Sequence, residues 1–167
     1  TYADRRRRMG FEYSGMVLHE YYFGNLKAGV ALDPNCFFVK SISGQFGSFE
    51  AWRVDFINAG RTRGIGWAMT YMDPLTGQIN NHFIHSHEEG SIPGFIPILV
   101  MDVFEHAYMV DHGADGRGAY INAFFENINW EVVAERFDEV AFGRIPTGRG
   151  VLQHMDQNTV EMLNIKG

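Results

Sequence analysis

The sequence has a single cysteine, Cys36, in 167 residues, so no disulfide can form within it. A solitary thiol is typical of proteins from reducing compartments, and we therefore expect a cytoplasmic protein. Apolar runs are short, and none approaches the roughly 20 residues of a membrane-spanning helix. The four arginines at positions 5–8 are not followed by the apolar stretch of a signal peptide, so the sequence predicts no membrane partner.

Positive charge is also scarce, because 14 Lys and Arg residues stand against 20 Asp and Glu residues and leave a formal net charge of −6. This balance argues against a general affinity for nucleic acid. Two common catalytic motifs are missing as well. Gly64 and Gly66 lack the third glycine of a dinucleotide fingerprint, and no serine lies in a G-x-S-x-G elbow.

Aromatic residues and histidines, in contrast, are plentiful. The 14 Phe, 7 Tyr and 3 Trp residues predict a dense aromatic core, and the 46% hydrophobic content is typical of a folded globular chain. Seven histidines against one cysteine indicate that any metal site would use nitrogen and oxygen ligands.

Hydrophobic spacing predicts an order of helices and strands. The first helix is expected to begin at the N-cap Asp4, and a loop at 27–43 is expected to follow it. The predicted strands cover residues 64–72, 78–85 and 95–101. The predicted helices cover residues 3–26, 46–58, 103–111, 117–128 and 130–138. The tail 139–167 is expected to be a loop with one short helix at 158–163.

The segment D-V-F-E-H-A-Y at 102–108 offers the clearest chemistry. Asp102 ends an apolar strand, where an unpaired carboxylate is costly. In one interpretation Asp102 and Glu105 form a capping box at the start of a helix. In the other, an oxygen of Asp102 and a nitrogen of His106, four residues apart, bind one metal ion. The residues alone leave both interpretations open.

Three more histidines give weaker indications. His19 lies on an aromatic helix face, and Gly15, one turn earlier, leaves space beside it at a cost of about 1 kcal/mol in helix stability relative to Ala. His85 and His87 point the same way if the second strand continues through both. The alternative for His19 is a packed structural histidine, and for His85 and His87 it is a half-exposed strand end.

Four segments together resemble the iron/manganese superoxide dismutase family. The segment at 102–108 is similar to the family's D-x-W-E-H-A-Y motif, and G-I-G-W-A at 64–68 is similar to G-S-G-W-x-W. The segment at 19–26, H-E-Y-Y-F-G-N-L, resembles H-x-x-[FY]-[WF]-x-N-L. The segment at 120–130, Y-I-N-A-F-F-E-N-I-N-W, resembles Y-x-x-A-F-W-N-V-x-N-W. All four occur in the family's order.

The resemblance implies an α+β fold. It has a helical N-terminal part, here lacking its first helix, and a C-terminal domain in which helices surround a three-stranded antiparallel sheet. The implied parts are residues 1–36, which remain of the helical domain, residues 44–138, which form the metal-binding domain, and residues 139–167, an extension that is mostly loop.

The resemblance also implies a set of metal ligands. The family holds its metal with three His, one Asp and one solvent molecule, and His19, Asp102 and His106 match three of these ligands. The remaining His belongs to the family's first helix, and residues 1–18 contain no histidine. Either an upstream segment supplies that ligand or the site has changed, and we expect the upstream segment because the rest of the pattern is intact.

Other residues acquire roles around this implied metal. The family places a Gln or His beside the bound solvent, and because the helix position is Gly15, His87 becomes the candidate catalytic residue. Glu105 is expected to orient a ligand His of a second subunit. Trp67 and Tyr108 are expected to form an apolar wall.

Three positions depart from the family's motifs. Phe104 and Met69 each replace a Trp, and Met109 replaces a Tyr near the subunit interface. These departures and the missing ligand predict a site whose activity is impaired.

The implied activity is the dismutation of superoxide anion to O2 and H2O2 by a redox-active iron or manganese ion, with iron slightly favoured because His87 comes from the strand side. The implied assembly is a homodimer or homotetramer. One alternative is a non-catalytic, dismutase-like metal-binding or interaction protein. Another is a metal-dependent hydrolase that uses Asp102, His106 and the histidines at 82–87, although no HExxH motif is present.

Overall fold

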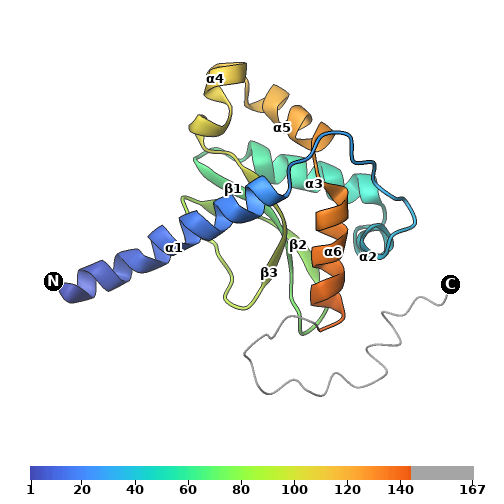
Figure 1. The fold of residues 1–167 in the computed structure, drawn as a ribbon, viewed down its shortest axis with the longest axis horizontal. Coiled ribbons are helices and arrows are strands. Elements are labelled where there is room, and N and C mark those ends of the chain that lie inside the picture. The colour runs from blue at the N-terminus through green and yellow to red at the C-terminus, as the bar shows by residue number, and fades with distance from the viewer. Residues whose placement is uncertain (144–167) are drawn as a thin grey trace.

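A computed structural model describes residues 1–143 of the chain (Figure 1). A long N-terminal helix precedes two shorter helices, a sheet and a second group of helices. The elements are α1 (Tyr2–Gly24), α2 (Phe37–Phe46), α3 (Phe49–Arg61), β1 (Gly66–Met72), β2 (Ile79–His85), β3 (Ile96–Asp102), the 3-10 helix η1 (Glu105–Ala107), α4 (Met109–His112), α5 (Arg117–Glu126) and α6 (Trp130–Ala141). This arrangement confirms the predicted α+β class with a three-stranded antiparallel sheet.

The sheet has the order β2-β1-β3, and both pairings are antiparallel. The central strand β1 is buried along its whole length. At one end of the sheet, Trp67 of β1 lies opposite Ile84 on one side and Asp102 on the other. Gly66 is needed just before it, because its φ is +147° and a Cβ atom there would overlap the Ile84 carbonyl oxygen. This register places the carboxylate of Asp102 at the edge of the core.

Helices cover the sheet and close the core around it (Figure 1). The second half of α1 packs against β3, α3 packs against β1 and β2, and α6 packs against α2 and β3. Residues 2–10 of α1 are exposed, and this part of the helix extends beyond the rest of the molecule. The predicted aromatic core is confirmed, because the largest fully buried side chains include Trp52, Trp67, Phe38, Phe56 and Phe137.

The predicted loop at 27–43 is wrong in its last part, because residues 37–43 belong to α2. Phe38 and Ile42, one turn apart, are both completely buried there. Gly47, with a φ of +85°, ends α2, and the Ser48 side chain then accepts a hydrogen bond from the Ala51 amide at 3.0 Å to begin α3. The helix predicted at 46–58 is therefore displaced to Phe49–Arg61.

The helix predicted at 103–111 is also wrong. Asp102 Oδ1 accepts a hydrogen bond from the Phe104 amide at 2.9 Å, and Phe104 keeps an extended backbone with a ψ of 156°. The capping box with Glu105 is therefore absent from this segment, which instead contains η1 and the short α4.

The first and last described helices differ from their predicted boundaries. Asp4 is not the N-cap of α1; Thr1 is, and Asp4 accepts a hydrogen bond from its hydroxyl at 2.7 Å. Helix α6 continues to Ala141, so the extension predicted from residue 139 begins as helix. The short helix predicted at 158–163 lies outside the described residues. Among residues 1–143, no helix combines the length and the apolar character needed to span a bilayer.

Candidate metal centre

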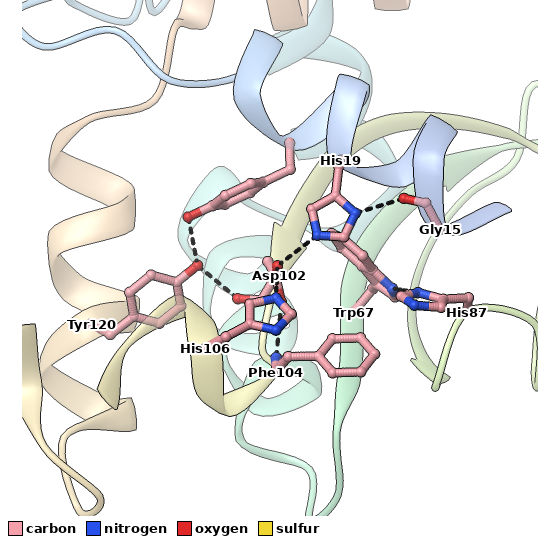
Figure 2. Close-up of polar contacts among 9 residues, drawn as sticks. Gly15, His19, Trp67, His87, Asp102, Phe104, His106 and Tyr120 are labelled. Carbon is pink, nitrogen blue, oxygen red and sulfur yellow. Dashed lines mark hydrogen bonds and ion pairs between the residues drawn. The ribbon is translucent and has the colours of Figure 1, made fainter. Parts of the chain in front are cut away.

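Three side chains from separate elements meet at one end of the sheet (Figure 2). His19 comes from α1, Asp102 ends β3, and His106 lies on η1. Asp102 Oδ2 is 3.0 Å from His106 Nε2 and 3.6 Å from His19 Nε2. One potential ligand atom of each residue lies within 4.8 Å of the other two. Among the described residues, this is the group of three whose donor atoms can share one metal ion.

The protonation of His19 follows from its second ring nitrogen. His19 Nδ1 lies 2.6 Å from the Gly15 carbonyl oxygen, one turn earlier in α1. A carbonyl can only accept a hydrogen bond, so in the neutral ring the proton sits on Nδ1 and the Nε2 lone pair points outward. This backbone contact fixes both the tautomer and the orientation of the ring, as is usual for metal-binding histidines.

The environment of Asp102 fits a cation. Its side chain is 2% exposed, and burial of a carboxylate is costly unless it is paired. Oδ1 is occupied by the Phe104 amide, so Oδ2 remains for the two histidines. His19 Nε2 presents a lone pair to Asp102 Oδ2, so these two electron-rich atoms repel each other. A positive ion between them would attract both. Two imidazole nitrogens and one carboxylate oxygen suit iron, manganese or zinc.

His87 lies beside this group but contacts it differently. The ring centroids of His87 and His19 are 6.2 Å apart, and Trp67 Nε1 donates a hydrogen bond to His87 Nδ1 at 3.1 Å. In the neutral ring the proton is therefore on Nε2. Burial, and secondarily His19, lower the pKa of His87 below its usual value, which favours this neutral form.

The space left by Gly15 is occupied by His87. A Cβ atom at Gly15 would lie 3.1 Å from Cδ2 and 3.2 Å from Nε2 of the His87 ring. The absence of a side chain at position 15 therefore allows the ring to approach α1. Gly15 and the His87 ring therefore lie next to each other, as the sequence suggested.

The other histidines of the 82–87 segment lie elsewhere. Strand β2 ends at His85, and Ser86 adopts a φ of +57°, so the condition under which His85 and His87 were expected to point the same way, a strand that continues through both, is not met. His85 is exposed. His82 packs against Tyr71 with ring centroids 5.6 Å apart, and burial lowers its pKa. These two histidines give no support to a hydrolase site.

Aromatic rings enclose the group. Trp67 is completely buried and meets His19 edge-on at 4.9 Å between centroids. Phe104 stacks on His106 at 5.2 Å and on His87 at 4.9 Å, and Phe11 contacts His87 at 4.6 Å. The sequence identified Phe104 only as a departure from a motif and did not identify Phe11. Tyr108, expected in the wall, packs against Tyr120 at 5.9 Å.

A pair of tyrosine hydroxyls supports the backbone of Asp102. The Tyr120 hydroxyl donates to the Asp102 carbonyl oxygen at 2.6 Å and lies 3.1 Å from the Tyr22 hydroxyl. All three residues are at most 9% exposed. Burial raises the pKa of both tyrosines, so both hydroxyls keep their protons. Both tyrosines belong to the quoted motifs, but no pattern in the sequence predicts that they meet.

One side of the group faces solvent. The His106 side chain is 58% exposed, and Glu105 beside it is also exposed. Two large apolar residues follow in the chain, Met109 at 44% exposure and Val110 at 91%. The contact expected between Glu105 and a second subunit stays a prediction.

Comparison with known proteins places these residues in context. The family model described as "iron/manganese superoxide dismutases, C-terminal domain" matches residues 34–136. The chain is 37% identical to superoxide dismutase [Mn] 2 of Halobacterium salinarum over 127 residues, 75% of this chain and 62% of that protein. It is 37% identical to superoxide dismutase [Fe] of Aquifex aeolicus over 138 residues, 83% of this chain and 64% of that protein.

A third relative is matched over slightly more of its length. Superoxide dismutase [Mn] 2 of Haloferax volcanii is 35% identical over 137 residues, 82% of this chain and 68% of that protein. The chain thus spans just under two thirds of the first two relatives and just over two thirds of the third.

Proposed function

Because the chain belongs to the iron/manganese superoxide dismutase family, we propose that it catalyses the dismutation of superoxide to O2 and H2O2 at a centre formed by His19, Asp102 and His106. The convergence of their three donor atoms within 4.8 Å is the observation that carries this proposal. A bound iron or manganese ion would supply the one-electron chemistry, taking an electron from one superoxide and giving it to a second. Two protons complete the H2O2.

The three residues have the properties that such an ion requires. His19 would bind through Nε2, since Gly15 occupies its Nδ1 side. Asp102 would bind through Oδ2 and contribute the single negative charge, while Phe104 fixes its other oxygen. His106 would bind through Nε2, the atom nearest Asp102. A fourth protein ligand from a segment upstream of residue 1, as the family's motif implies, would complete the set.

His87 is proposed as the residue that contacts the reacting oxygen without binding the ion. Its Nδ1 accepts from Trp67, so its Nε2 proton is available for an oxygen of solvent or substrate inside the centre. A donor at this position stabilises negative charge on that oxygen and adjusts the reduction potential of the ion. Since a histidine rather than a glutamine provides this donor, iron is slightly favoured over manganese.

We further propose that the exposed side of the centre forms a two-fold interface in a homodimer or homotetramer. His106, Met109 and Val110 are all exposed there, although two of them are large and apolar. In such an interface Glu105 of each subunit would accept a hydrogen bond from His106 Nδ1 of the other. The scarcity of cysteine supports a cytoplasmic location.

Metal analysis combined with a rate measurement tests the proposed activity. The purified chain is loaded with Fe(II) or Mn(II), and metal per chain is measured together with superoxide decay after pulse radiolysis. We expect bound metal and dismutation in the parent, and loss of both in His19→Ala. The matched control is His82→Ala, which removes a histidine that packs on Tyr71 outside the centre and should keep both properties.

Each other outcome contradicts the proposal in a different way. Iron or manganese bound without dismutation would favour the non-catalytic alternative. Zinc bound in preference to both would favour hydrolysis, and the lack of any bound metal would favour an interaction protein.

A further inference from the structure

The helix that carries His19 packs along the strand that carries Asp102, and Asn25 at its C-cap donates a hydrogen bond to the Val100 carbonyl of that strand. Two further contacts between them, one helical turn apart, involve Asp102 itself. The first is the approach of the His19 ring to the Asp102 carboxylate, with Nε2 and Oδ2 at 3.6 Å. The second involves Tyr22, three residues after His19 and thus on the same side of α1. Its hydroxyl meets that of Tyr120, which in turn donates to the Asp102 carbonyl oxygen.

The direction of these hydrogen bonds follows from their partners. The Asp102 carbonyl can only accept, so the Tyr120 proton is committed to it at 2.6 Å. The Tyr22 hydroxyl must then donate to the Tyr120 oxygen at 3.1 Å. The resulting chain runs from α1 through α5 to the end of β3, and its members are 9%, 6% and 1% exposed.

We propose that Tyr22 and Tyr120 are positioning residues that set the separation between His19 and Asp102 and thereby the metal affinity of the centre. This inference rests on the proposed function for the identity of the metal. The role concerns geometry only, because this series of hydrogen bonds ends on the Asp102 backbone carbonyl and offers no route for a proton to the carboxylate. Without the two hydroxyls, α1 would keep its hydrogen bond from Asn25 to Val100, but the turn that carries His19 would lose its link to the Asp102 backbone.

The packing around the pair allows the role of the hydroxyls to be tested separately from that of the rings. The Tyr22 ring stacks on Phe124 at 6.2 Å, and the Tyr120 ring lies against Tyr108 at 5.9 Å. A Phe at either position would keep these ring contacts and remove only the hydrogen bond. Tyr→Phe variants therefore isolate the proposed role from packing.

The test is the affinity of the metal-free full-length chain for Mn(II), measured by competition with a chelator. We expect Tyr120→Phe to weaken binding about 10-fold, within the 10–100-fold range typical of residues that support metal ligands. Tyr22→Phe should weaken it less, and the double variant should match Tyr120→Phe alone, because Tyr22 acts through Tyr120. The visible spectrum of bound Co(II) should shift in Tyr120→Phe if ligand geometry changes.

The matched control is Tyr71→Phe, which removes another buried tyrosine hydroxyl. Tyr71 is four residues beyond Trp67 along β1, roughly 13 Å away. It should lose stability comparably to Tyr120→Phe yet keep the parent's Mn(II) affinity and Co(II) spectrum.

The outcomes separate this inference from the proposed function. Unchanged affinity in Tyr120→Phe, or equal losses in Tyr120→Phe and Tyr71→Phe, would overturn the positioning role even in an active dismutase. Additive losses of Mn(II) affinity in the double variant would contradict the idea that Tyr22 acts through Tyr120. A parent that binds Mn(II) with Tyr120-dependent affinity but fails to dismutate superoxide would support the positioning role and contradict the proposed function. A parent that binds no Mn(II) would overturn both.

Discussion

The substitution Gly15→Ala is expected to have two opposing effects of similar size on the free energy of unfolding. Replacing a helical glycine with alanine stabilises a helix by about 1 kcal/mol. At position 15, however, the new Cβ would lie 3.1–3.3 Å from three atoms of the His87 ring, closer than most carbon contacts. The ring has little room to move, since Phe104 and Phe11 flank it and Trp67 holds its Nδ1.

The net stability change should therefore be small. Displacement of His87 by a few tenths of an ångström weakens its hydrogen bond from Trp67, which is worth about 1 kcal/mol. We expect the free energy of unfolding to stay within about 1 kcal/mol of the parent, because the helix gain and this loss nearly cancel. Dismutation should nonetheless fall about 10-fold at equal metal content, as expected when a group that supports the metal site moves.

Urea denaturation and superoxide decay, measured on the same metal-loaded samples, check both expectations. The matched control is Gly10→Ala in the same helix, whose Cβ would meet only Glu88 Oε2 at 3.6 Å. It should gain the full helix stabilisation of about 1 kcal/mol and keep the parent rate. In a His87→Ala background, Gly15→Ala should gain the same stabilisation, because the obstructing ring is gone.

Higher stability and full activity in Gly15→Ala, as expected for Gly10→Ala, would contradict the proposed role of the His87 ring. That result would mean that the His87 ring moves freely and does not act in the reaction. A large loss of stability would also contradict it, because the backbone of α1 rather than the ring would then have yielded.

Four further predictions concern single residues. His87→Ala should keep metal content and lower the dismutation rate about 10-fold or more, and unchanged turnover at equal loading would remove His87 from the site. Asp102→Ala should abolish metal binding measured by elemental analysis, whereas retention of the metal would contradict its role as a ligand. Phe38→Ala should lower the free energy of unfolding by about 3–5 kcal/mol in urea denaturation, because it empties a completely buried site. Val110→Arg should shift sedimentation toward a monomer, and an unaltered dimer would place the interface elsewhere.

The elements with strong periodicity were predicted well. Helix α1 and the three strands lie within two residues of their predicted bounds, because alternating and three- or four-residue spacing is clear there. Helix α2 was missed because the preceding Gly29 and Pro34 dominate the composition, while Phe38 and Ile42 are too few to establish a period. The break after Asp102 depends on a hydrogen bond from the Phe104 amide, which local spacing cannot reveal.

The centre was only partly accessible from the sequence. The resemblance to the family's motifs grouped His19, Asp102 and His106, and the structure places their donor atoms close to one another, while their roles as ligands stay predictions. The turn at Ser86, which directs His87 toward Gly15, depends on a left-handed residue that no pattern indicated. Contacts between side chains of different helices arise only from tertiary packing, so their absence from the prediction is expected.

The placement of the three donor residues along the chain has a consequence for how the molecule opens. Asp102 and His106 lie within one short segment, whereas His19 lies more than 80 residues earlier, on the N-terminal helix, whose residues 2–10 are exposed. An ion held by all three would close a long covalent loop, and the entropy of that closure would then oppose detachment of α1. Loss of the ion would therefore lower the free energy needed to undock α1. Metal binding should therefore slow the hydrogen exchange of the α1 amides, although these lie far along the chain from the turn that holds Asp102 and His106.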